Sequence, residues 1–273
     1  MGSKLFLTLG LFLPHFIFSQ NLEFSKGAAQ MAFADASVAV QSEWSLWSNP
    51  AGLSGSEQSS CHFSVRRTGD LPFLNQYSSG YTFPIRKMNF GLLINRYGGQ
   101  EYNEQSIAFG LAHKIAAVSL GWKCNLLQIH QEGQESKISV LMEFGGIIDL
   151  SEHLRWGAHV SNVNQPALSK KSDAVAPTTF RSGFFYLPWN QLELGFEIEK
   201  NMNFPLNVKT GFGYHFFKKF VARAGLNTDP LKTFYGMGFS SKRLTIDYAL
   251  SEHYFLGFTN EISLSIHLKS KKD

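Results

Sequence analysis

From about residue 58 to residue 268, apolar residues alternate with polar or small ones in a period of two. The clearest segments are 192–198 (LELGFEI) and 244–250 (LTIDYAL). Such alternation is typical of β-strands that have one face in an apolar medium and the other in water or a polar interior. The pattern therefore predicts an all-β protein.

The alternating segments divide into about fourteen predicted strands. Most are close to the ~9–11 residues that a tilted strand needs to cross a bilayer. The predicted ranges are 58–67, 73–84, 87–97, 104–113, 114–127, 137–150, 153–162, 178–187, 191–200, 205–217, 218–227, 232–241, 242–251 and 257–268.

The length of each predicted connection depends on whether the strand before it is odd- or even-numbered. Tight turns follow the even-numbered strands, as at 85–86, 113–114, 151–152, 188–190, 217–218 and 241–242. Longer connections follow odd-numbered strands, as at 68–72, 98–103, 128–136, 163–177 and 252–256. Bacterial membrane barrels have short periplasmic turns and longer outer loops, whereas a soluble sandwich has no reason for this sorting. We expect a transmembrane antiparallel β-barrel with both termini periplasmic.

The two faces of the predicted strands differ in chemistry. Phe, Leu, Ile, Trp and Tyr occupy one phase and must face lipid, since Arg or Lys near mid-bilayer costs ~2–4 kcal/mol. The opposite phase carries Lys123, Glu143, Asp149, Glu193, Glu197, Lys209, Arg223, Arg243, Asp247 and Glu261. We expect these charges to pair with one another and with a segment that fills the lumen.

The N-terminus predicts export. Lys4 precedes the apolar run 5–18, and Ser19-Gln20 follows, which is typical of a cleaved signal peptide over 1–19. No other stretch is long and apolar enough to predict a transmembrane helix. Cys61 and Cys124 both fall in the apolar phase and belong to no metal-spaced cluster, so we favour free thiols over a disulfide.

Between the signal and the first strand lies a segment, 20–57, that is rich in Ala, Gly and Ser. Its most specific part is the sequence WSNPAGLS over 47–54. Asn49-Pro50 favours a turn, and Gly52 permits a sharp reversal of the chain. Small side chains allow such a segment to pack inside a narrow lumen. The alternative is a Gly/Ala-rich loop that leads into a soluble β domain.

The small-residue run 34–40 followed by W-x-N-P-A-G-L-S resembles the N-terminal segment of the PorV/PorQ family. That resemblance implies an outer-membrane barrel related to FadL-type channels, with fourteen strands and an N-terminal plug. It marks Trp47, Asn49, Pro50, Ala51 and Gly52 as the plug motif. It also implies a non-enzymatic accessory subunit of the type IX secretion machinery. This chain is shorter than typical members that carry cargo.

Catalytic motifs are missing from the sequence, which contains no H-E-x-x-H, G-x-S-x-G or phosphate loop. His130 and His253 stand near acidic residues in predicted outer loops, and a solvated loop residue is our interpretation of each. We expect that the protein is not an enzyme and that it binds no metal or cofactor. The net charge of +4 and the short charged tail 269–273 form no basic patch interleaved with aromatic residues, so we expect no nucleic acid partner.

Two functions follow from these observations. The first is a non-enzymatic accessory subunit of an outer-membrane secretion or assembly complex, in contact with outer-membrane lipids. The longest predicted loop, Val163–Pro177 with Lys170, Lys171 and Asp173, is the first candidate for the partner contact, and the alternative is a mobile solvated loop. The alternative is a FadL-like passive channel for small hydrophobic molecules. Gly145-Gly146 either kinks the predicted sixth strand for lateral release or makes room for the plug.

Overall fold

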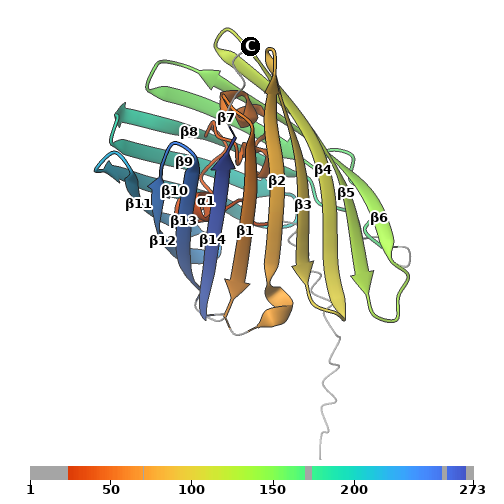
Figure 1. Ribbon diagram of the computed structural model, residues 1–273. Coiled ribbons are helices and arrows are strands. Elements are labelled where there is room, and N and C mark those ends of the chain that lie inside the picture. Colours follow the sequence, from red (N-terminus) through yellow and green to blue (C-terminus); the bar gives the residue numbers. More distant parts are fainter. Residues whose placement is uncertain (1–23, 70, 170–173, 254–256, 269–273) are drawn as a thin grey trace, which may run out of the picture.

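The computed structural model describes residues 24–69, 71–169, 174–253 and 257–268. Fourteen strands form one closed antiparallel barrel in which each strand pairs with its sequence neighbours and β14 pairs with β1 (Figure 1). The predicted signal peptide and C-terminal tail lie outside the described residues. The predicted fold class, an all-β antiparallel barrel of about fourteen strands, is confirmed.

The strands are β1 (Ser60–Thr68), β2 (Gln76–Ile85), β3 (Met88–Gly98), β4 (Tyr102–Ile115), β5 (Val118–Gln131), β6 (Lys137–Asp149), β7 (Leu154–Ser161), β8 (Thr179–Trp189), β9 (Leu192–Asn201), β10 (Leu206–Phe216), β11 (Phe220–Thr228), β12 (Leu231–Ser240), β13 (Leu244–His253) and β14 (Gly257–His267). Among the described residues, no helix is long and apolar enough to cross a membrane.

Most strand ends differ from the predicted ones by one to four residues, and two of the differences change an element. Pro72–Leu74 forms a short 3₁₀ helix, η3, in place of the start of a strand. The turn between β4 and β5 lies at Ala116-Ala117 and not at 113–114, because the ladder continues to the pair Ile115–Val118. Lys114, a polar residue that suggested a turn, instead stays in the strand and pairs with Asp149 at 2.7 Å.

The two ends of the barrel differ in their connections. We call the end formed by the connections after even-numbered strands the turn rim, where none exceeds four residues. We call the other end the loop rim; it carries the longer connections 69–75, 132–136 and 162–178. The difference in connection length between the two rims is smaller than predicted, because the loop-rim connections 99–101 and 229–230 are also short. Extension of β4 back to Tyr102 shortens the first of these.

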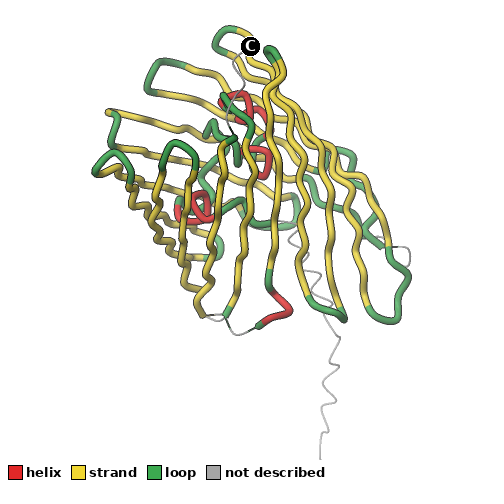
Figure 2. Tube along the Cα trace, viewed as in Figure 1, coloured by secondary structure: helices red, strands yellow, loops and turns green. Residues whose placement is uncertain are grey.

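The outer wall of the barrel is apolar. Exposed residues on it include Leu92 (46%), Ile107 (58%), Phe144 (47%) and Ile262 (53%). An apolar surface this continuous requires an apolar solvent, which is the environment of a membrane barrel. The strands wrap around a set of short helices that lie inside the barrel (Figure 2).

Candidate functional site

Residues 24–59, which we call the luminal segment, lie inside the barrel (Figures 1 and 2). The segment contains α1 (Ala28–Ala32) and two 3₁₀ helices, η1 (Ser45–Trp47) and η2 (Pro50–Gly55). Nearly all of its apolar side chains are buried. It begins at Phe24, beside a cavity near the loop rim, and ends at the turn rim, where β1 starts.

Inward-facing glycines of the wall let the luminal segment approach the strand backbone. Several face each other across neighbouring strands: Gly91–Gly110, Gly121–Gly145, Gly157–Gly183 and Gly195–Gly211–Gly225. A Cβ atom at Gly211 would lie 2.5 Å from Cγ of Phe33, and one at Gly145 would overlap the Asn49 side chain. Contacts this short do not occur between real atoms. The luminal segment therefore occupies the space that a side chain larger than hydrogen would need at these glycines.

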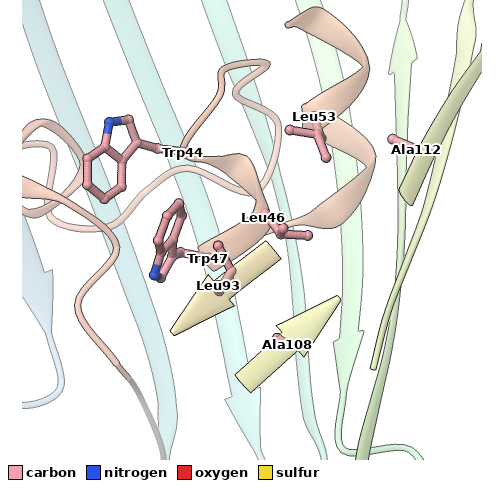
Figure 3. Packing of buried hydrophobic residues seen from close by; sticks show 7 residues of the cluster. All are labelled: Trp44, Leu46, Trp47, Leu53, Leu93, Ala108 and Ala112. Atoms are coloured by element: carbon pink, nitrogen blue, oxygen red, sulfur yellow. The ribbon is translucent and has the colours of Figure 1, made fainter. Parts of the chain in front are cut away.

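An aromatic and aliphatic cluster holds the centre of the luminal segment. Trp44, Leu46, Trp47 and Leu53 pack against Leu93, Ala108 and Ala112 of β3 and β4 (Figure 3). The rings of Trp44 and Trp47 are 4.7 Å apart, and Trp44 also contacts His62 of β1 at 5.2 Å. The indole N–H groups donate to Ser265 Oγ at 2.8 Å and to Asn95 Oδ1 at 2.9 Å, so both are satisfied.

The structure places all five residues of the plug motif, Trp47, Asn49, Pro50, Ala51 and Gly52, in the buried part of the luminal segment. Asn49 caps η2 by accepting from the Ala51 N–H at 3.1 Å, and Pro50 occupies the first helical position. The Asn49 amide donates to the carbonyl of Val38 at 2.6 Å and to those of Gly146 and Ala158 at 3.3 Å each. One side chain therefore ties the segment to itself and to β6 and β7.

We expect Asn49→Asp to lower the free energy of unfolding by about 2 kcal/mol. The carboxylate keeps the helix cap but loses the N–H donors, and it leaves buried carbonyls unsatisfied at ~1–3 kcal/mol. Urea unfolding in detergent micelles measures the change. Asn203→Asp, at an exposed position, is the matched control. Equal unfolding midpoints for the two variants would contradict the role of Asn49.

Two buried carboxylates of the wall hold the first half of the luminal segment. Glu197 of β9, 1% exposed, accepts from the backbone N–H groups of Ser37 and Val38 at 2.9 and 2.8 Å. Glu261 of β14, also 1% exposed, accepts from the Ser25 hydroxyl. Charged acceptors make the stronger kind of hydrogen bond, so these are firm attachments.

Most of the inward charges pair with one another across one or two strands, as the sequence predicts. Arg243 is the exception: it is exposed in the connection between β12 and β13 and does not face the lumen, because β13 begins only at Leu244. Glu143 pairs with Lys123 at 2.9 Å and with His159 at 3.1 Å. The other pairs are Arg66–Glu261, Arg181–Glu199, Lys209–Glu199, Lys209–Glu197, Arg223–Asp247 and Arg223–Glu193. Pairing of this kind offsets the cost of removing charges from water.

Two cavities lie along the lumen. The loop-rim cavity has a volume of about 800 Å³, and its lining includes the apolar or aromatic residues Phe24, Met31, Leu74, Tyr97, Tyr102, Phe204 and Phe234. The inner chamber, of about 70 Å³, lies deeper, among polar residues that include Lys123, Glu143 and His159. Phe24, Thr179 and Asn201 line both, so they mark the junction between the two.

A seam interrupts the wall beside the inner chamber. β6 pairs with β7 only over Phe144–Asp149, which leaves its loop-rim half without a strand partner on that side. Residues after β7 cover this edge: Val163 N–H donates to Met142 O at 3.2 Å. Asn164 accepts from Met142 N–H at 3.1 Å and donates to Val140 O at 2.8 Å. Hydrogen bonds from the loop thus satisfy the backbone N–H and C=O groups at this edge of β6. Elsewhere in the barrel a neighbouring strand does so.

The sequence does not predict the seam, because its pattern indicates a loop outside the barrel over 163–177. In the structure Leu168 and Ala176 are buried against Leu127, Ile129 and Leu141, so part of this connection packs into the barrel. A signal was present, because Leu127 and Leu141 are apolar at inward positions where most neighbours are polar. Inward apolar residues indicate a packed neighbour.

The remaining sequence-based candidates have mixed outcomes. Lys170, Lys171 and Asp173 lie outside the described residues. Gly145-Gly146 does not form a bulge, since the pairing of β6 with β5 and β7 is continuous through both residues. His130 bonds to Ser136 at 3.1 Å, and the described residues contain no cluster of three His, Cys, Asp or Glu suited to a metal.

The fold and the occupied lumen define a fourteen-stranded barrel of the outer-membrane type with an internal N-terminal segment. Similar solved structures are the toluene transporter TodX of Pseudomonas putida (TM-score 0.72, 12% identity, 90% of this chain and 98% of that one) and the toluene transporter TbuX of Ralstonia pickettii (0.68, 12%, 91% and 100%). The CymD monoaromatic hydrocarbon channel is also similar (0.68, 11%, 91% and 98%).

These likenesses show the fold. No protein-family model and no curated protein matches the chain. The resemblance to the PorV/PorQ family therefore rests on the 34–54 motif alone. The three structures are described as toluene transporters and a monoaromatic hydrocarbon channel.

Proposed function

We propose that this protein is an outer-membrane channel for the passive passage of small hydrophobic molecules. The observation that carries the proposal is the loop-rim cavity, whose volume of about 800 Å³ falls in the ~300–1,000 Å³ range of ligand pockets. Its lining combines nine apolar or aromatic residues, which include Phe24, Tyr102 and Phe204, with a larger set of polar and charged ones. Barrels of the same fold are described as transporters of toluene and channels for monoaromatic hydrocarbons.

The route that we propose continues from the loop-rim cavity past Phe24 to the inner chamber and leaves the barrel at the seam. Ser161 at the end of β7, Asn162 directly after it and Pro177 shortly before β8 line the inner chamber, so the chamber abuts the seam. At about 70 Å³ the chamber is smaller than the ~150 Å³ cavity that holds benzene. The structure is thus a closed state, and passage requires the loop that covers the seam to move.

We expect Thr179→Trp to reduce toluene entry into proteoliposomes to the rate of protein-free vesicles. Thr179 is 7% exposed and lines both cavities, so an indole there obstructs the junction. Phe180→Trp, at the next position on β8 and 52% exposed on the outer wall, is the matched control and should transport normally. Toluene entry no faster with the unaltered protein than without protein would refute the channel.

The second candidate is the accessory subunit of an outer-membrane secretion or assembly complex. The W-x-N-P-A-G-L-S motif favours it, because this motif forms the anchored centre of the luminal segment and occupies part of the lumen. Purification in mild detergent followed by mass spectrometry separates the candidates. A stoichiometric large partner supports the accessory subunit, whereas an isolated barrel with bound apolar molecules supports the channel.

A further inference from the structure

Two adjacent connections of the turn rim form a basic patch. Lys218 and Lys219 lie between β10 and β11, and Lys242 and Arg243 lie between β12 and β13; all four are exposed. The two turns adjoin, since Ser240 N–H donates to Lys219 O at 2.8 Å. No acidic residue occurs over 216–220 or 240–244, and none of the four basic residues forms an ion pair within the described part of the chain.

A cluster of phenylalanines lies directly beside this patch on the outer wall. The ring of Phe216 is 5.8 Å from those of Phe217 and Phe220, and Phe220 is 5.2 Å from Phe239. Phe217 is 85% exposed, the largest exposure of any described large apolar residue. We call the four phenylalanines and the four basic residues together the turn-rim patch.

The backbone of the turn-rim patch holds Phe217 in an unfavourable conformation. Phe217 has φ 51° and Lys218 has φ 58°, both in the left-handed region that Gly or Asn ordinarily occupies. A bulky residue there costs of order 1 kcal/mol or more, and such costs cluster at sites of recognition. The turn thus projects an aromatic ring and two ammonium groups outward from one point of the rim.

We propose that the turn-rim patch binds the phosphate of an anionic glycerophospholipid. Lysine and arginine at a membrane surface attract anionic headgroups, while aromatic rings favour the layer just beneath them. The phenylalanine cluster continues into the apolar outer wall through Tyr214, Met237 and Ile246, which lipid chains must cover. This continuity identifies the occupant as a lipid and not a soluble protein.

Two other turns of this rim repeat the arrangement only in part. Lys114, near the end of β4, is neutralised by Asp149, which also pairs with Arg155 at 3.3 Å. Arg86 and Lys87 are exposed beside a second aromatic cluster, in which the ring of Phe83 is 5.7 Å from that of Phe90. This turn carries two basic residues where the turn-rim patch carries four, and it lies on the far side of β1 and β14 from the patch. The turn-rim patch therefore concentrates more positive charge than either of these turns.

The test titrates the full-length protein in dodecylphosphocholine micelles with dioleoylphosphatidylglycerol or dioleoylphosphatidylcholine, and native mass spectrometry counts the bound lipid. We expect preferential binding of phosphatidylglycerol. Each basic residue near an anionic surface is worth about fivefold in affinity. The variant Lys218→Gln/Lys219→Gln/Lys242→Gln/Arg243→Gln should therefore bind phosphatidylglycerol about 100-fold or more weakly.

The matched control removes four positive charges from the loop-rim half: Arg67→Gln/Arg96→Gln/Lys137→Gln/Lys200→Gln. It should retain the preference for phosphatidylglycerol. Phe217→Ser should weaken the binding of both lipids, and it should leave the salt dependence of phosphatidylglycerol binding unchanged. An equal loss in the control, or no preference in the unaltered protein, would overturn the proposal. Heat-dependent gel mobility verifies that each variant is folded, and toluene entry is measured separately because the channel can fail independently.

Discussion

Glu197→Ala is expected to lower the free energy of unfolding by about 3–5 kcal/mol, the cost of breaking a buried pair by removing one partner. The change leaves the N–H groups of Ser37 and Val38 without their acceptor. It also removes a carboxylate that lies 3.6 Å from the Lys209 ammonium, which is itself almost fully buried. Urea unfolding in detergent micelles measures the loss.

Two further variants make the test specific. Glu197→Gln keeps an oxygen that can accept from Ser37 or Val38 and should lose less stability than the alanine variant. Glu252→Ala removes an exposed carboxylate and should change stability by no more than ~0.5 kcal/mol. A loss below about 1 kcal/mol for Glu197→Ala would show that the carboxylate does not hold the luminal segment, given the ~3–5 kcal/mol of a buried pair.

Gly145→Val is expected to displace the luminal segment from the wall and to destabilise the barrel by about 1–3 kcal/mol, the usual cost of overpacking. Its Cβ would overlap the Asn49 side chain and lie 3.2 Å from Cδ of Pro50. Hydrogen exchange of peptides that span 46–53 should become faster, because η2 no longer packs against β6.

Gly146→Val is the matched control for the same strand. A Cβ at Gly146 would meet no atom closer than 3.9 Å. Valine suits a strand position that faces lipid, so this variant should be neutral or slightly more stable. If both valine variants behaved alike, the fit between the glycines and the luminal segment would not control its position.

The period of two is sufficient to predict most strands, because it depends only on alternate faces meeting different solvents. It places Glu197 and Lys209 inward and Ile198 and Phe196 outward, as observed. It does not reveal the seam, because the shortness of β7 depends on where residues 162–168 pack and not on local alternation. It also places the turn after β4 too early, since a polar residue such as Lys114 can continue a strand when an acid lies opposite.

The sequence alone determined that the chain forms a barrel, which face meets lipid, and that a segment of small residues precedes the strands. Only the tertiary structure decided that Asn49 meets Gly145 and that Glu197 holds Ser37 and Val38. The physical reason is that every inward residue of a closed barrel faces the same lumen. Alternation predicts only that a side chain points inward, whereas strand register and tilt decide which distant part of the sequence supplies its partner.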